Sequence, residues 1–214
     1  MLEQEQYAAT PAQVRELVAA RGWATIVTGT PTPVVSHLPV VLLPADPARP
    51  DELTVLAHLA RADAELHELG RHDVVLVVEG PEGYISPTWY ATDTFVPTWN
   101  FVVAHLHGRP ELLGPEETWD VLVRTVEKFE AERPVPWRLD TVTEFARSIA
   151  PYTSGFRLTT TRVAAKAKLS QDKPAEVVER VIAALDVDPV HGNPALARAM
   201  REITTPLLVE GRHP

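Results

Sequence analysis

The stretch from Glu79 to Arg109 carries the side chains best suited to holding a flat cofactor. Two phrases in it combine hydroxyl, proline and aromatic residues: residues 85–90 read ISPTWY and residues 96–101 read VPTWNF. Proline fixes the backbone and removes an amide donor, so neither phrase is typical of a plain core strand. Rigid aromatic loops with hydroxyl groups are typical of surfaces that bind a planar cofactor or shape a pocket. Two aromatic turns that cap a β-barrel would explain the same pattern, and both interpretations stay open.

Three histidines raise the question of a metal or heme site. His58 lies at the end of a predicted strand, where an imidazole serves as a ligand, as a structural hydrogen-bonding group or as a surface residue. His105 and His107 are two apart on another predicted strand, so they share a face. The sequence supplies no carboxylate pattern to complete a metal site there. Barrel packing or a cofactor wall is therefore the favoured interpretation of that pair.

A lysine, a hydroxyl and an amide are grouped at Lys168, Ser170 and Gln171, on a predicted loop between a strand and a helix. This group would act as an anion clamp or a general base, or it would be a solvated turn. The clustering of three of the four lysines within residues 166–173 favours the functional interpretation. Asn100 lies between two aromatic residues, and if it is buried it must be hydrogen-bonded, with a ligand as one partner.

Composition narrows the class of protein. The 214 residues suffice for one large domain, or for one domain with an appendage. The net charge of −9 argues against direct binding to nucleic acid. Without cysteine, the chain has neither a disulfide frame nor a thiolate ligand for heme. No apolar run approaches the ~18 residues of a membrane span, and the acidic N-terminus is no secretory signal, so we expect a cytoplasmic protein.

Strands are expected early in the chain and helices late. The predicted strands cover residues 23–28, 34–43, 53–57, 74–78, 101–112 and 155–163, and the predicted helices cover residues 11–21, 64–69, 115–133, 141–149, 174–185 and 194–203. Pro39 inside the second strand suggests an edge or a bulge. No glycine-rich phosphate loop follows a strand, so the pattern favours a β-barrel with appended helices over a Rossmann sheet.

These elements suggest one domain over residues 1–214. Its barrel core would comprise residues 10–112 and 155–165, with a helical insertion over residues 115–150 and C-terminal helices over residues 174–205.

Several motifs, in order, resemble the PaiB-like family, which is usually labelled an FMN-binding negative transcriptional regulator. They are HLP at residues 37–39, HLARA at 58–62, GP at 80–81, YISPTWY at 84–90, VPTWNF at 96–101 and KLSQDKP at 168–174. The resemblance covers roughly residues 10–190. It implies an α+β fold built on a split β-barrel of the flavin-reductase and pyridoxamine-oxidase type. Such barrels are typically homodimers with the cofactor at the subunit interface.

The same family contains the heme-dependent piperazate synthases, which close N5-hydroxyornithine into a six-membered ring through an N–N bond. By resemblance, His58 would be the axial ligand of heme b, and Arg61 would pair with a propionate or the substrate carboxylate. Lys168 would be the base. The other residues assigned to the cofactor site are Tyr84, Ser86, Trp89, Thr98, Trp99 and Asn100, and those assigned with Lys168 to the catalytic site are Ser170 and Gln171.

Three details bear on the choice of cofactor. The barrel half is poor in cations, with only Arg61 well placed for a flavin phosphate. Ala167 separates two lysines where the family often has an aromatic residue, which leaves room for a bulkier cofactor or a substrate. His58 offers an imidazole without competition from cysteine. We therefore expect a heme enzyme, with an FMN-binding regulator or a flavin oxidoreductase as the alternatives.

Overall fold

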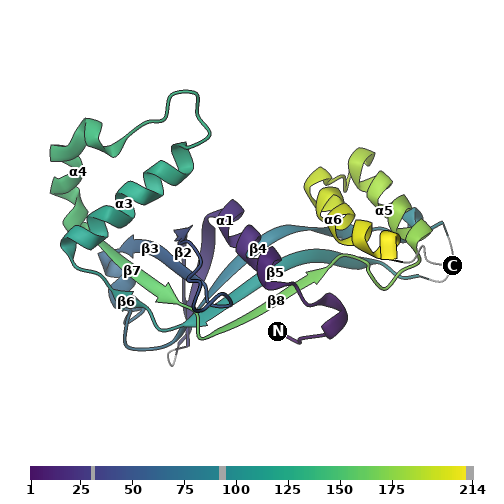
Figure 1. The fold of residues 1–214 in the computed structure, drawn as a ribbon, viewed down its shortest axis with the longest axis horizontal. Coiled ribbons are helices and arrows are strands. Elements are labelled where there is room, and N and C mark those ends of the chain that lie inside the picture. The colour runs from purple at the N-terminus through teal and green to yellow at the C-terminus, as the bar shows by residue number, and fades with distance from the viewer. Residues whose placement is uncertain (30–31, 92–94, 211–214) are drawn as a thin grey trace. The chain divides into compact units, whose positions relative to one another are not determined.

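The computed structural model describes residues 1–29, 32–91 and 95–210, so residues 92–94 of the aromatic stretch lie outside it. The strands are β1 (Trp23–Thr28), β2 (Val34–Leu42), β3 (Thr54–Ala60), β4 (Val74–Ile85), β5 (Thr98–Gly108), β6 (Glu111–Leu112), β7 (Thr153–Thr159) and β8 (Arg162–Lys168). They form one sheet in the order β6-β7-β3-β2-β1-β4-β5-β8 (Figure 1).

The helices are α1 (Pro11–Arg21), α2 (Arg61–Leu66), α3 (Pro115–Glu130), α4 (Thr143–Ile149), α5 (Ala175–Val187) and α6 (Pro194–Glu210). Short 3-10 turns are η1 (Glu5–Tyr7), η2 (Pro87–Trp89), η3 (Leu139–Val142) and η4 (Ala150–Tyr152). None of the helices in the described ranges combines the length and the apolarity needed to span a lipid bilayer.

The chain divides into two compact units. Unit 1 comprises Met1–Thr10, Glu79–Val103 and Ala164–Pro214, and unit 2 comprises Pro11–Val78 and Ala104–Val163. Strands β4, β5 and β8 each contribute residues to both units. The single-domain organisation inferred from the sequence stays a prediction.

Strand β2 changes partner at Pro39, which explains how a proline fits inside the sheet. Residues Val34 to Pro39 pair with β1, and Val40 to Leu42 pair with β3. Because β2 has a neighbour on each side, the expected edge position is wrong. Proline costs the sheet little at this changeover, since it has no amide hydrogen to satisfy. The next amide, of Val40, donates to the carbonyl oxygen of Gly22 at 2.9 Å.

In unit 2, α3 packs across β2, β3 and β7 (Figure 1). Pro115 opens this helix, and the Glu117 carboxylate accepts a hydrogen bond from the amide of Gly114 at 3.1 Å. Thr118 and Val121 are its buried residues and face the sheet, where Gly155 of β7 makes room for Thr118. This contact fixes the helix over the part of β3 that carries His58.

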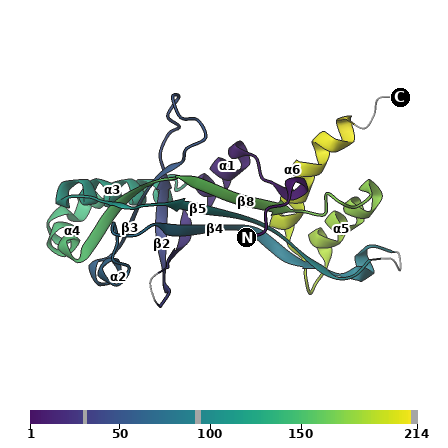
Figure 2. The same cartoon turned by 90° about the horizontal axis from the view of Figure 1, so that it is seen from below.

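In unit 1, α5 and α6 pack against each other beside the far ends of β4 and β5 (Figure 2). Their shared core is apolar and fully covered; its members are Ile85, Tyr90, Leu169, Val177, Val181, Leu185, Leu196 and Met200. Burial of apolar surface contributes ~25 cal/mol of stabilising free energy per Å². This contribution holds α5 and α6 against the strands.

Several local expectations need correction. Residues 101–112, predicted as one strand, belong to β5 and β6, with a break at Arg109 and Pro110. β4 continues to Ile85 instead of ending at 78, and residues 155–163 belong to two strands with a turn at Thr160 and Thr161. His58 lies inside β3 rather than at its end, and Lys168 is the last residue of β8 rather than part of a loop. Pairing with neighbouring strands extends β4 past residues of weak strand propensity, such as Glu79, Gly80 and Pro81.

Candidate functional site

His58 is a partly buried histidine with an unsatisfied ring nitrogen. It pairs with Gly155 of β7 across the antiparallel ladder. Its Nδ1 atom is buried and has no hydrogen-bond partner among the described residues. Burial lowers the pKa of His58 below its usual value, so the imidazole is neutral near pH 7. A neutral imidazole with a free nitrogen is the form that ligates iron or accepts a proton.

The face of the sheet onto which His58 projects follows from its partner. Directly paired residues of antiparallel strands place their side chains on the same face. A Cβ atom at Gly155 would lie 2.9 Å from Thr118 Oγ1, so that face is the one covered by α3. The amide of Gly155 also donates to Thr118 Oγ1, at 3.2 Å. His58 therefore projects toward α3.

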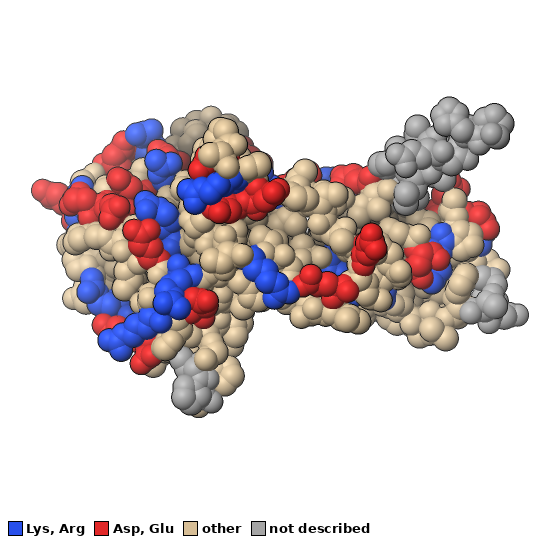
Figure 3. Space-filling model, turned by 60° about the horizontal axis from the view of Figure 1, so that its bottom comes forward, with Lys and Arg blue, Asp and Glu red and all other residues tan. Residues whose placement is uncertain are grey.

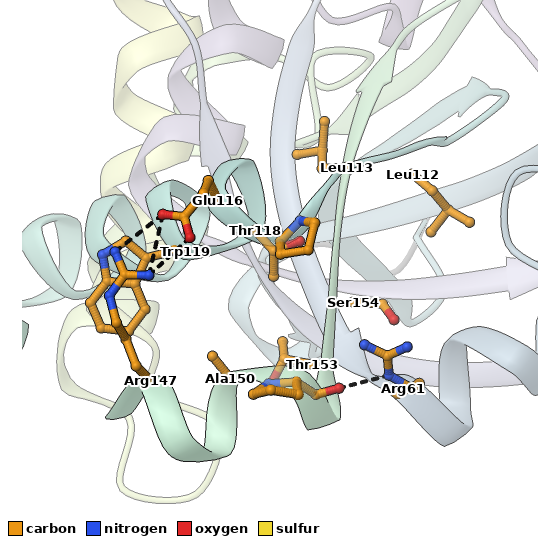
Figure 4. A pocket seen from close by; sticks show the side chains of 12 residues that line it. Arg61, Leu112, Leu113, Glu116, Thr118, Trp119, Arg147, Ala150, Thr153 and Ser154 are labelled. Atoms are coloured by element: carbon orange, nitrogen blue, oxygen red, sulfur yellow. Dashed lines mark hydrogen bonds and ion pairs between the residues drawn. The ribbon is translucent and has the colours of Figure 1, made fainter. Parts of the chain in front are cut away.

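Arg61 opens α2 and lines a cavity of about 480 Å³ in unit 2 (Figure 4). Its Nε donates to the carbonyl oxygen of Pro151 at 2.7 Å, which aims the guanidinium without neutralising it. No carboxylate of the described chain pairs with Arg61. A guanidinium fork without a counter-charge is suited to a phosphate or carboxylate from outside.

The opposite wall of this cavity is closed by a fixed ion pair. Arg147 makes two-pronged hydrogen bonds to the carboxylate of Glu116, the shortest at 3.0 Å (Figure 4). Its guanidinium also lies 4.4 Å from the ring centroid of Trp119. Arg147 is thus already neutralised, and Arg61 remains the cation available to a ligand in this cavity. Thr153 and Ser154 add hydroxyl-bearing side chains to the lining.

In unit 1, Lys168 is held by oxygen acceptors. Its ammonium donates to Thr98 Oγ1 and, at 3.1 Å, to the carbonyl oxygen of Trp99. Burial lowers the pKa of Lys168 below its usual value; Asp172 opposes this change, and the neighbouring Lys166 and Lys173 add to it. A lysine whose pKa is lowered by burial and by other cations is suited to act as a base.

Ser170 and Asn100 form a buried pair next to this lysine. The Asn100 amide donates to Ser170 Oγ at 2.9 Å, and both residues are covered from solvent. Ser170 has a left-handed backbone, with φ of 67°, which turns the chain after β8. Gln171 spans the same turn, accepting from the amide of Leu169 at 2.7 Å and donating to the carbonyl oxygen of Ala167 at 2.6 Å. Their polar groups therefore serve the turn that follows Lys168.

The predicted aromatic residues are spread over β4, η2 and β5. Tyr84 contacts Trp99 edge to face, with ring centroids 6.2 Å apart. The Trp89 indole donates to Asp188 at 3.3 Å, and Ser86 caps η2 by accepting from the amide of Thr88 at 3.3 Å. These contacts order the aromatic stretch and leave the Trp99 ring half exposed.

The structure thus brings most predicted residues into two groups. His58 and Arg61 belong to unit 2, as do His105 and His107; the other residues assigned to the cofactor and catalytic sites belong to unit 1. His105 and His107 contact each other, with ring centroids 6.4 Å apart. The described residues contain no group of three or more His, Cys, Asp or Glu side chains placed to hold a metal ion.

Several lining residues were missed from the sequence. Trp119, Glu116 and Arg147 lie on helices that the pattern predicted, but their contact depends on how α3 and α4 meet. Glu82 and His191 lie beside Tyr84 and Trp99 in unit 1, more than 100 positions apart in the chain. In the sequence, the one signal that could have identified Glu82 was its position within the aromatic stretch of residues 79–109.

Comparisons with known proteins agree with this architecture. A family model described as a putative FMN-binding domain matches residues 1–162. The chain is 27% identical to "Protease synthase and sporulation protein PAI 2" of Bacillus subtilis over 164 residues, which cover 75% of this chain and 77% of that protein. It is 34% identical to "Uncharacterized protein YKL070W" of Saccharomyces cerevisiae over 106 residues, which cover 46% of this chain and 61% of that one.

Two solved structures share the fold at low sequence identity. The FAD and heme binding protein from Mycobacterium smegmatis superposes with a TM-score of 0.59 and 16% identity, covering 92% of this chain and 97% of that one. The flavocytochrome Anf3 from Azotobacter vinelandii gives a TM-score of 0.51 and 19% identity, covering 78% and 68%. The expected α+β split β-barrel with appended helices is thereby confirmed.

Proposed function

This chain belongs to the family of putative FMN-binding domains, and from that premise we propose that it is a heme b-dependent enzyme that converts N5-hydroxyornithine to piperazic acid. The observation that carries the proposal is the neutral His58 imidazole, whose buried Nδ1 has no partner among the described residues. A purely structural histidine at such a position is normally hydrogen-bonded.

Two residues of unit 2 would hold an iron porphyrin. His58 would hold the iron, and the fork of Arg61 would pair with a propionate or with the substrate carboxylate. Two proteins of the same fold are named for heme or as a flavocytochrome, which supports this assignment. Bound heme would supply a Lewis-acidic iron that polarises the N–O bond of the hydroxylamine.

The reaction is redox-neutral. The bond between the α-nitrogen and N5 forms, the N–O bond breaks, and the hydroxyl group leaves as water. The α-nitrogen must first lose its ammonium proton. Lys168 would take that proton at Nζ, since burial lowers its pKa and makes the neutral amine accessible. Thr98 and the Trp99 carbonyl orient the Lys168 ammonium once it is formed.

The protein would also bind the substrate in a folded conformation that brings its two nitrogens together. Binding would then offset the entropic cost of that conformation. Tyr84, Trp89 and Trp99 would supply aromatic surface to the cofactor or the substrate. We also propose a homodimer with the cofactor near the subunit interface.

An FMN-binding regulator without turnover is the second candidate, favoured by the free guanidinium of Arg61, which would hold a phosphate as readily as a carboxylate. The relative named for protease synthesis and sporulation points in the same direction. A flavin oxidoreductase would use the same residues. Neither candidate explains why His58 keeps a buried ring nitrogen unpaired.

Incubation of hemin-loaded protein with N5-hydroxyornithine separates these functions. We expect the substrate to lose one water and yield a cyclic hydrazine, detected by mass spectrometry and by NMR of the ring. Hemin without protein, and hemin with the Lys168→Met variant, are the controls. An unconverted substrate, with FMN bound in place of heme, would replace the enzyme proposal with the regulator.

A further inference from the structure

Unit 1 contains an open cleft of about 450 Å³, and two of its lining residues, Tyr84 and Trp99, are among those proposed above to supply aromatic surface to the cofactor or the substrate. It is lined by Glu82, Gly83 and Tyr84 of β4, Trp99 of β5, and the turn His191–Asn193 between α5 and α6. Three of these side chains are aromatic rings, one is a carboxylate, and none is a lysine or an arginine.

The three rings form a splayed wall with Tyr84 in the middle. Tyr84 meets Trp99 at a centroid distance of 6.2 Å with the planes 64° apart, and meets His191 at 5.0 Å with the planes 54° apart. The face of an aromatic ring carries negative charge density, so a wall that contains several rings can attract a cation.

Glu82 adds a full negative charge to this wall. One oxygen, Oε2, accepts a hydrogen bond from the Trp99 indole, which fixes both side chains. The other oxygen, Oε1, has no partner within the described part of the chain. A ligand in the cleft would therefore contact a carboxylate that is oriented by Trp99 and whose Oε1 atom is available to it.

The turn that carries His191 is rigid. Asp188 accepts hydrogen bonds from the amides of Val190 and His191, at 2.9 and 2.8 Å. Asn193 donates to the carbonyl oxygen of Glu82 at 2.9 Å and caps α6 by accepting from the amide of Leu196 at 3.1 Å. The cleft is therefore preorganised, which lowers the entropic cost of binding.

The floor of the cleft has no room for side chains. A Cβ atom at Gly83 would come within 3.0 Å of Leu196, and one at Gly192 within 2.3 Å of the Asp188 carbonyl oxygen. A side chain at Gly192 would therefore clash with the backbone, whereas one at Gly83 would require the Leu196 side chain to move.

We propose that this cleft binds the alkylammonium group of a small organic cation, between the aromatic wall and the free oxygen of Glu82. The carboxylate and the absence of a basic lining residue disfavour an anion. This site does not depend on the proposed function, although N5-hydroxyornithine carries an ammonium group of the same class.

NMR of the full-length protein tests the site. The five tryptophans give five indole N–H signals, and the signal of Trp99 is identified by its loss in the Trp99→Phe variant. Choline is the probe, and 3,3-dimethylbutan-1-ol is its uncharged isostere. We expect a saturable shift of the Trp99 signal with choline at low ionic strength, and a much smaller one with the alcohol.

Two variants test which side chains contribute to the affinity for choline. Glu82→Gln removes the charge and should weaken choline binding about fivefold, and His191→Ala should weaken it about threefold while leaving the bond between Glu82 and Trp99 in place. Glu79→Gln, at an exposed residue of the same strand, should leave affinity unchanged. The proposal is overturned by equal shifts with choline and the alcohol, by no shift at 100 mM choline (about the weakest affinity expected of one such contact), or by unchanged affinity in Glu82→Gln.

Discussion

Lys168 shows how a residue acquires reactivity from its surroundings. Its side chain is partly buried, two further lysines lie nearby, and its ammonium donates to two oxygen acceptors. The sequence predicted the lysine cluster and the hydroxyl beside it. It did not predict that Ser170 and Gln171 would direct their polar groups into the turn, because that depends on the burial of Asn100 and on the left-handed backbone of Ser170.

Replacement of Lys168 by Met should lower turnover of N5-hydroxyornithine by about 10²–10⁴-fold, the usual contribution of a general base. In the wild type the rate should fall as the pH drops below the lowered pKa of Lys168, because the amine is then protonated. A pH–rate profile measures both effects. The Lys166→Met variant removes one of the cations that lower the pKa of Lys168, so it should keep the plateau rate and shift the profile to higher pH. A Lys168→Met enzyme with wild-type rates would remove this lysine from the mechanism.

His67 is a buried histidine that links three elements of unit 2. Its Nδ1 lies 2.7 Å from Thr28 Oγ1, and its Nε2 lies 3.0 Å from Ser36 Oγ. Burial lowers the pKa of His67, against the opposing charge of Asp63. The folded protein therefore resists a proton that the unfolded chain accepts below its ordinary pKa of about 6.5.

The contribution of His67 to the free energy of unfolding should accordingly be constant above about pH 7 and decrease as the pH falls through the histidine range. His67→Gln should reduce this slope by at most ~1.4 kcal/mol per pH unit, the linkage of one proton. Urea unfolding between pH 8 and pH 5.5 measures the slope. His72→Gln, at an exposed histidine, is the matched control, and equal slopes in the wild type and His67→Gln would contradict the assignment.

At the scale of elements, β3 and the helix after it organise the unit 2 site. β3 ends at Ala60 and α2 begins at Arg61, so His58 and Arg61 are held by one continuous segment. The sequence named both residues through the HLARA motif, and their role in a cofactor site stays a prediction. It misplaced the strand end, because pairing with β7 up to Thr153 extends β3 beyond its apolar pattern.

Substitution of Gly155 tests whether the close packing of α3 against β7 matters for stability and for hemin binding. In Gly155→Ala the new methyl group would lie 2.9 Å from Thr118 Oγ1 and 3.0 Å from the Thr118 Cα atom, so the helix must shift. We expect a loss of about 1–3 kcal/mol in the free energy of unfolding and weaker hemin binding. Thermal and urea unfolding give the first quantity. Gly29→Ala has nothing within 4 Å of its new atom and should be close to neutral.

The whole molecule is acidic, with a net charge of −9, and its visible face carries basic and acidic side chains side by side (Figure 3). From the net charge, the sequence analysis predicted that the protein has no broad basic surface for binding nucleic acid. The proposed homodimer would need an exposed apolar face. Trp23, Val27 and Val35 share one face of the sheet in unit 2, since Val35 pairs with Val27 and Trp23 with Pro39.

If that face joins two copies of the chain, Val35→Lys should shift the protein toward the monomer in sedimentation equilibrium. Val35 is 54% exposed, so the substitution is compatible with the folded subunit. Val187→Lys, at a position 80% exposed on α5, should leave the oligomeric state unchanged. A wild-type protein that is monomeric at micromolar concentration would contradict the homodimer.

The central claim is that His58 binds heme iron, and the absorption spectrum during hemin titration tests it most directly. The account predicts a sharp Soret band that saturates at one hemin per chain in the wild type and in His72→Ala, and that is lost or strongly displaced in His58→Ala. Circular dichroism of the His58→Ala variant establishes that it is folded. An identical Soret band in folded His58→Ala would contradict the ligand assignment, and a wild type that binds FMN but not hemin would contradict the heme enzyme.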